Sequence, residues 1–167
     1  SMASSYISIC YVNVKTNQYI PYFATSDFEK WYQKSTFQKD FESYVNTNVL
    51  PEYRFMLLDA ISEESFASYY NDANSKNSNG ALFTIPFQDN HTGAPLYYEL
   101  SLIRVDEEHV IFAIQNRDYI IRKENEQRKV LADAKDKAEA LNMSTYDYLV
   151  SLAVKSGIGA NKLIYLP

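Results

Sequence analysis

The sequence is poor in the residues that build most metal and catalytic centres. Its 167 residues include one cysteine, two histidines and four glycines. The single Cys10 excludes an internal disulfide, and its default interpretation is a buried apolar side chain. His91 falls in a turn and His109 at a strand start, and both are interpreted as solvated side chains. Because no Ser-His-Asp set, metal-ligand spacing or glycine-rich phosphate loop occurs, we expect neither a metal site nor catalysis in this chain.

Positive charge and long apolar runs are also scarce. The formal net charge of -5 argues against a nucleic-acid partner, since such a partner attracts basic surfaces. No apolar run approaches the roughly 18 residues that a membrane-spanning helix needs, and no signal peptide is recognisable. Hydrophobic residues at 46% and charged residues at 22% are typical of a folded globular chain. Together these features predict a cytoplasmic protein without a membrane segment.

The order of strand-like and helix-like segments predicts an α+β fold. Strand-like runs are rich in β-branched and aromatic residues, and helix-like runs carry apolar residues at helical spacing. In chain order the segments are strands 6–14 and 19–23, helices 28–45, 52–60 and 62–70, and strands 81–88, 96–105 and 109–115. A break in the first helix is expected near Ser35-Thr36, and the run 71–80 is the clearest loop. Apolar residues on both faces of the last two strands predict a sheet that is covered on both sides.

Three segments in a fixed order resemble the PAS family of small sensor domains. The segment 50–60 is similar to the family's "hPEDRxxF" pattern, and 96–102 resembles its fourth strand, with Tyr97 or Tyr98 where Trp is usual. The segment 114–120 (IQNRDYI) resembles the "hxRDIT" pattern that ends the domain. The resemblance implies a five-stranded antiparallel sheet of strand order 2-1-5-4-3, with short helices on one face and a long C-terminal helix.

The run that follows Asn116-Arg117-Asp118 contains neither glycine nor proline up to residue 152. It is rich in charge, and we expect one helix over 119–152. In PAS domains the Asp and Thr of the final pattern tie the last strand to the outgoing helix. The resemblance implies that role for Asp118, whereas Ile120 stands where the Thr is usual.

A heptad pattern runs along this predicted helix, with its positions alternately three and four residues apart. The seam consists of Ile120, Glu124, Gln127, Leu131, Ala134, Ala138, Leu141, Thr145, Tyr148 and Leu152. Because alanines bury little area, the seam predicts a weak homodimer through the C-terminal helix and the sheet face. A solvated helix that packs on its own sheet is the alternative. Signal transmission is assigned to Asp118, Ile120, Leu131 and Leu141.

The segment 147–157 resembles the "DxLTGLxNRRG" sequence that opens GGDEF diguanylate cyclase domains. Asp147, Leu149, Leu152 and Gly157 match this sequence, while its Thr, Gly and Asn are replaced. The two resemblances imply four parts in chain order: a tag or unordered start (1–5), a PAS-like sensor domain (6–118), a helical linker (119–146) and the beginning of an output domain (147–167).

Fifteen tyrosines are a high count for one small domain. Several are expected to line an internal cavity and to offer hydroxyls to a small-molecule ligand, although core packing explains most of them equally well. Arg54, Tyr98 and Gln115 are the candidate ligand contacts. Haem-binding PAS domains take a histidine from a middle helix, and no histidine lies within 26–80. The flavin-binding Asn-Cys-Arg-Phe segment is also missing, so haem and flavin are disfavoured and the cofactor stays unknown.

These features predict a cytoplasmic PAS sensory or regulatory domain of a bacterial-type signalling protein. Dimerisation or a small-molecule cue would alter the helix after Asp118 and so control an output domain, a diguanylate cyclase in the leading interpretation. The alternatives are the sensor region of a histidine kinase and a stand-alone adaptor that binds partner proteins through an aromatic sheet face.

Overall fold

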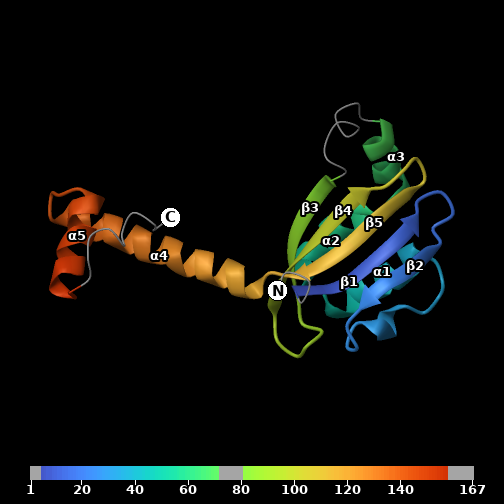
Figure 1. Ribbon diagram of the computed structural model, residues 1–167, viewed down its shortest axis with the longest axis horizontal. Helices are drawn as coiled ribbons and strands as arrows, with labels where there is room; N and C mark the ends of the chain where they lie inside the picture. Colours follow the sequence, from blue (N-terminus) through green and yellow to red (C-terminus); the bar gives the residue numbers. More distant parts are fainter. Residues whose placement is uncertain (1–4, 72–80, 158–167) are drawn as a thin grey trace. The chain divides into compact units, whose positions relative to one another are not determined.

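The computed structural model describes residues 5–71 and 81–157 of the chain (Figure 1). Contacts divide the chain into two compact units, Ser1–Asp118 and Tyr119–Pro167. Three predicted segments fall wholly or partly outside the described residues: the start 1–5, the loop 71–80 and the end of the segment 147–167.

Five strands of the first unit form one antiparallel sheet. They are β1 (Tyr6–Asn13), β2 (Tyr19–Ala24), β3 (Ala81–Asp89), β4 (Leu96–Arg104) and β5 (His109–Asn116). Their order in the sheet is β2-β1-β5-β4-β3, with antiparallel neighbours throughout. The predicted α+β class, the number of strands and their order are confirmed. The pairing of β1 with β5 places the last strand, and therefore the exit from the sheet, near its centre.

Short helices fill the connection between β2 and β3. They are the 3₁₀ turn η2 (Glu29–Trp31), α1 (Phe37–Asn48), α2 (Pro51–Ala60) and α3 (Glu63–Asn71). The predicted break near Ser35-Thr36 is confirmed, because Thr36 Oγ1 accepts a hydrogen bond from Lys39 N (3.3 Å) and starts α1. Only three residues before the break are helical, however, so a helix beginning at residue 28 is wrong. Pro51 occupies the first position of α2, where a missing N–H costs little.

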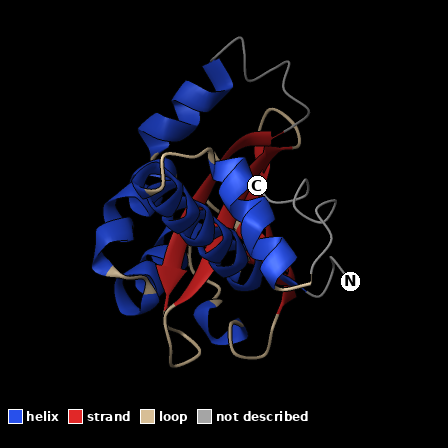
Figure 2. Cartoon of the chain, turned by 90° about the vertical axis from the view of Figure 1, so that its left-hand side faces the viewer, coloured by secondary structure: helices blue, strands red, loops and turns tan. Residues whose placement is uncertain are grey.

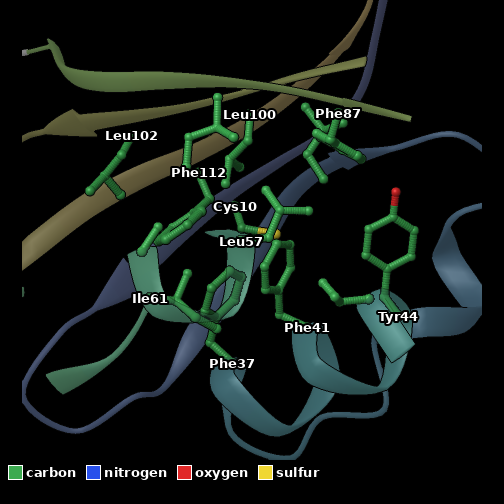
Figure 3. Close-up of a cluster of buried hydrophobic side chains, with 14 of the residues drawn as sticks. Cys10, Phe37, Phe41, Tyr44, Leu57, Ile61, Phe87, Leu100, Leu102 and Phe112 are labelled. Atoms are coloured by element: carbon green, nitrogen blue, oxygen red, sulfur yellow. The ribbon is translucent and has the colours of Figure 1, made fainter. Parts of the chain in front are cut away.

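The hydrophobic core lies between these helices and one face of the sheet (Figures 1 and 3). Alternate residues of the strands point to this face, among them the buried Leu100, Leu102 and Phe112. Leu102 lies directly opposite Phe112 in the pairing of β4 with β5, and Leu100 lies opposite Ile114. The ring centres of Phe112 and Phe37 lie 4.5 Å apart, and this contact joins α1 to the sheet.

The other face of the sheet carries apolar residues that stay exposed. Ile20 is 66% exposed and Tyr22 is 83% exposed, because the described helices of the first unit pack on the opposite face. The prediction of a sheet covered on both sides is therefore wrong for this unit. We call this surface the outer sheet face: Ile9, Tyr11, Ile20, Tyr22 and Ile111.

The sheet is followed by α4 (Asp118–Ala140) and α5 (Thr145–Lys155), so the prediction of one helix over 119–152 is wrong. Asn142 adopts a left-handed φ of 53°, and Met143 N donates to the Ala138 carbonyl oxygen at 3.0 Å. This is a Schellman-type end, which terminates α4.

A serine begins the next helix. Ser144 Oγ accepts a hydrogen bond from Asp147 N at 3.1 Å and so caps the N-terminus of α5. The acid Asp147 lies in the first turn, where the helix dipole favours negative charge. The segment 141–144 therefore carries both a stop signal and a start signal.

The helix break interrupts the predicted heptad seam. Leu141 lies in the turn and is 61% exposed, Ile120 is also exposed, and Leu131 is half-buried on α4. The buried residues of the two helices are small: Ala134 and Ala138 of α4 and Ala153 of α5. Figures 1 and 2 show α5 turned back across the C-terminal part of α4. A single seam along both helices is therefore incompatible with this conformation, and the homodimer stays a prediction.

None of the described helices, the 23-residue α4 included, combines the length and the apolar character that a bilayer-spanning helix requires. The polar sequence of α4 explains this result, since charged residues occur in every turn. For the described residues, the prediction of no membrane segment agrees with this finding.

Candidate functional site

A small cavity lies between the first helical segments and the sheet. Its volume is about 20 Å³, which is room for about one water molecule. Tyr19, Tyr32 and Tyr44 contribute to its wall, in line with the prediction that some tyrosines line a cavity. The complete lining is Ser8, Cys10, Tyr19, Phe28, Trp31, Tyr32, Phe37, Asp40, Phe41, Tyr44, Leu100, Phe112 and Ile114, several of which appear in Figure 3.

Three polar groups meet at the strand side of the cavity. The Tyr32 hydroxyl is hydrogen-bonded to the Ser8 hydroxyl, and the Cys10 thiol donates to the Tyr32 oxygen at 3.1 Å. Burial raises the pKa of the Cys10 thiol, and burial together with the neighbouring Cys10 raises the pKa of Tyr32. Both groups keep their protons at neutral pH, so this cluster offers hydrogen bonds rather than a nucleophile. Cys10 is buried, as predicted.

Asp40 brings a carboxylate to the helix side of the cavity, where it is 6% exposed. It accepts hydrogen bonds from the Tyr19 hydroxyl, the Ser35 hydroxyl (2.8 Å) and Gln33 N (3.2 Å). The last two bonds hold the loop before α1, in which Lys34 has a left-handed φ of 57°. Such a conformation costs a non-glycine residue about 1–3 kcal/mol, so the bonds of Asp40 offset part of this cost.

The indole N–H of Trp31 is buried and has no hydrogen-bond partner among the described residues. A buried donor without an acceptor is unfavourable, and the cavity that Trp31 lines is large enough for a water molecule to accept this bond. The residues that line the cavity thus contribute aromatic rings, four hydroxyls, one thiol, one carboxylate and one unsatisfied donor.

A second polar cluster lies at the end of β3. His91 has a side chain that is only 1% exposed, so its interpretation as a solvated loop residue is wrong. Its Nδ1 lies 2.7 Å from Asp89 Oδ1, and its Nε2 lies 3.2 Å from Asp27 Oδ2. The second contact falls outside hydrogen-bond geometry and is therefore electrostatic. Asp89 is fully buried and also accepts a hydrogen bond from the hydroxyl of Tyr44, which joins this cluster to the cavity.

Two carboxylates raise the pKa of His91. Burial alone lowers it, because desolvation disfavours the imidazolium, but the hydrogen bond and charge of Asp89 and the charge of Asp27 outweigh burial. Tyr44 of α1 and Tyr98 of β4 also face this cluster. Burial, with Asp89 as the next cause, raises the pKa of both tyrosines, so they stay neutral. His91 is therefore the group in this cluster whose charge changes near neutral pH.

We expect the free energy of unfolding to fall as the pH rises above about 6.5 and through the raised pKa of His91. Protonation of His91 favours the folded state, so its contribution is complete below the ordinary pKa of 6.5 and is lost at higher pH. Urea unfolding at a series of pH values measures this effect. His91→Gln should remove this pH dependence, while His109→Gln, which changes the other histidine, should keep it. An unchanged profile in His91→Gln would contradict the assignment.

The three predicted ligand contacts do not come together in the fold. Arg54 Nε donates to the Val49 carbonyl oxygen at 2.9 Å. Tyr98 is buried in the core, whereas Gln115 follows Ile114 on the opposite face of β5 and donates to Ser5 Oγ at 2.7 Å. None of these three residues lines the cavity. A ligand-binding role for Arg54, Tyr98 and Gln115 stays a prediction.

The exit from the sheet is held by hydrogen bonds to β4. Asp118 Oδ1 accepts a bond from Tyr97 N at 3.0 Å, and Arg117 N donates to the Tyr97 carbonyl oxygen at 2.9 Å. Asn116 Oδ1 accepts a further bond from Asp118 N at 2.9 Å. The apolar Ile120 cannot add the side-chain hydrogen bond that a Thr would supply. Asp118 thus connects the first turn of α4 to the neighbour of β5, and its role in transmitting a signal stays a prediction.

Neither Asp40 nor His91 is among the residues predicted for the site, although the sequence contains a weak indication that Asp40 faces the core. Phe37, Asp40, Phe41 and Tyr44 recur at the spacing of one helix face, so Asp40 is a single acid among aromatic residues. No comparable pattern marks His91, whose partner Asp27 lies far away in the chain. Across residues 5–71 and 81–157, no three His, Cys, Asp or Glu side chains are grouped to hold a metal ion.

Comparison with known proteins adds no relative from which a function follows. No protein-family model matches the chain, and a search of curated proteins finds no similar sequence. The likeness to PAS domains accordingly rests on three sequence segments and on the order of the strands.

Proposed function

We propose that the chain is a cytoplasmic sensory or regulatory domain of the PAS type, which acts on an output domain through α4. The observation that carries this proposal is the bonding of the β5–α4 junction to β4. Asp118 and Arg117 both bond to the backbone of Tyr97, one through its side chain and one through its N–H. A shift of β4 against β5 would therefore move the first turn of α4.

The core supplies a route from an internal cue to this junction. Tyr98, which follows Tyr97 in β4, is buried and lies 5.4 Å from the ring of His91. Leu100 of the same strand lines the cavity. A small molecule in the cavity, or a change in the charge of His91, would shift β4, the strand whose Tyr97 N–H is bonded to Asp118. These contacts support a sensor that works through rearrangement of its core.

In this proposal the output domain is a diguanylate cyclase and the signalling form is a homodimer. The resemblance of the segment 147–157 supports the first part. The exposed part of α4 and the outer sheet face support the second, because exposed apolar surfaces commonly mark contacts between proteins.

The outer sheet face also supports a second candidate function, a stand-alone adaptor that binds partner proteins. Its most exposed members, Ile20 and Tyr22, lie on the edge strand β2, which is open to a partner. Sedimentation of the full chain separates the two candidates. A dimer supports the signalling proposal, and a stable monomer favours the adaptor.

The signalling proposal predicts that Asp118→Ala changes the activity of a fused output domain. In the experiment, the full chain replaces the native sensor of a diguanylate cyclase. Seven fusions, each one residue longer than the last, place the output domain in each of the seven heptad phases relative to the chain. The rate of cyclic di-GMP formation is measured for each fusion. In the active phases Asp118→Ala should change the rate by about tenfold or more, because a hydrogen bond to a charged acceptor contributes about 1.5–3 kcal/mol and about 1.4 kcal/mol corresponds to a factor of ten.

Asp133→Ala is the matched control, since Asp133 is an exposed acid of α4 that pairs with Lys137 four residues later. It should leave the rate unchanged. Equal rates for Asp118→Ala and the unchanged chain in all seven phases would contradict transmission through this junction.

A further inference from the structure

Among the described residues, Asp40 is a buried carboxylate that faces the cavity with no cation paired to it. Its hydrogen bonds come from neutral donors on Tyr19, Ser35 and Gln33. A buried carboxylate that is compensated only by neutral dipoles is stabilised further by a cation beside it, because the low dielectric strengthens their attraction. The wall of the cavity therefore has one position that favours positive charge.

Aromatic rings enclose the space beside this carboxylate. Phe37, Phe41 and Tyr44 lie on the same face of α1 as Asp40, and all four line the cavity. The rings of Phe37 and Phe41 are stacked with their centres 5.5 Å apart, and the Tyr19 ring meets Phe37 edge-on at 5.5 Å. Ring faces carry partial negative charge and attract cations, which is the means by which aromatic sites recognise alkylated ammonium groups.

Tyr19 and Tyr32 separate the cavity from an open groove, since both residues line each of these spaces. Their ring centres lie 5.7 Å apart. A cavity of about 20 Å³ admits only a water-sized group, so a methylated amine enters by displacing one of these rings. The groove also carries the exposed Lys34 and Lys39, whose positive charges do not attract a cation. The preference for a cation therefore comes from the cavity and not from the groove.

We propose that this cavity binds a small organic ammonium ion, with its charge beside Asp40 and its methyl groups against the aromatic rings. This inference rests on the proposed sensory function, because the ammonium ion would be the signal that the domain senses. Displacement of Tyr32 by the ligand breaks its hydrogen bond to Ser8. Ser8 lies opposite Ile114 of β5, the strand that leads into α4.

The only tryptophan of the chain, Trp31, lines the cavity, so its fluorescence reports binding directly. The full chain is titrated with trimethylammonium chloride, with tert-butanol as a neutral compound of similar size and sodium chloride as the salt control. We expect a saturable change with trimethylammonium alone. Asp40→Asn should weaken binding at least about tenfold, because the charged partner is lost. Asp136→Asn, which removes an exposed acid of α4, should leave binding unchanged.

Asp40 also holds the loop before α1, so a second variant protects the test against misfolding of Asp40→Asn. Phe41→Leu keeps an apolar side chain and removes one ring, and it should weaken trimethylammonium binding about threefold to tenfold. Equal responses to trimethylammonium and tert-butanol, or no saturable response to either, would overturn the inference.

The two proposals fail separately. Binding is read at Trp31 in the first unit and needs no change in α4. Fusions that respond to Asp118→Ala but bind no ammonium ion would overturn the ligand assignment alone. Ammonium binding that leaves cyclic di-GMP formation unchanged would count against the sensory function and leave the ligand assignment standing.

Discussion

Replacement of Phe112 by alanine is expected to lower the free energy of unfolding by about 3–5 kcal/mol, because it opens a hole in the centre of the core. The centre of the Phe112 ring lies 4.5 Å from the ring centre of Phe37 and 6.1 Å from the ring centres of both Phe41 and Phe66. It therefore joins β5 to α1 and α3 at once. A domain of this size has a total stability of about 5–15 kcal/mol, so the loss is a large fraction of the whole. Urea unfolding followed by Trp31 fluorescence and by circular dichroism measures it.

Phe55→Ala is the matched control for this prediction. Phe55 lies on α2 and is 82% exposed, so its truncation leaves no cavity. The control should change the free energy of unfolding by less than about 0.5 kcal/mol, as surface substitutions usually do. Similar losses in Phe112→Ala and Phe55→Ala would show that the aromatic cluster is not the centre of the core.

Asp89→Ala is expected to destabilise the fold by a comparable amount, about 3–5 kcal/mol near pH 6, because it leaves two buried groups without their acceptor. The Tyr44 hydroxyl loses its partner, and His91 loses the nearer of its two carboxylates. The variant should also weaken the pH dependence assigned to His91, since the hydrogen bond and charge of Asp89 are what raise its pKa most. Urea unfolding between pH 5 and pH 9 tests both expectations in one experiment.

The chain contains an exposed counterpart of this pair. His109 Nδ1 lies 2.8 Å from Asp106 Oδ1, so the same two side-chain groups meet at a more exposed position. Asp106 Oδ1 also accepts bonds from the backbone N–H groups of Glu108 and His109. Asp106→Ala should nevertheless cost much less free energy of unfolding than Asp89→Ala, because water replaces these exposed contacts. If Asp106→Ala costs as much as Asp89→Ala, burial is not the source of the effect, and the account of this cluster is wrong.

Local sequence patterns predicted most of the helices and strands correctly. The single helix predicted over 119–152 is wrong because two local patterns in that segment favour different structures. The heptad spacing over 120–152 favours one continuous helix, whereas Asn142 and the Ser144–Asp147 pair favour a stop and a new start. The structure follows the second set, because Asn tolerates a left-handed conformation and Ser144 satisfies an N–H at the start of α5. The seam is apolar only in part, so it offers too little burial to prevent the break.

The candidate site was harder to predict than the fold. The sequence predicts Arg54, Tyr98 and Gln115 as polar or aromatic groups near the expected cavity, but Gln115 lies on the other face of the sheet. A sequence specifies that side chains alternate along a strand, but it does not specify which face the helices cover. Ser8 and Tyr32, which do meet at the cavity, lie 24 residues apart in the chain, so only the tertiary fold brings them together.

The sequence by itself determined the order of strands and helices, the break before α1, the start of α2 at Pro51 and the charged character of α4. These are local properties, set by propensity, capping and periodicity within a few residues. Only the tertiary structure decided that Asp40 faces aromatic rings, that His91 lies between Asp89 and Asp27, and that one face of the sheet stays exposed. The physical reason is that burial and pKa depend on which distant segments pack together, and that packing is set by the fold as a whole.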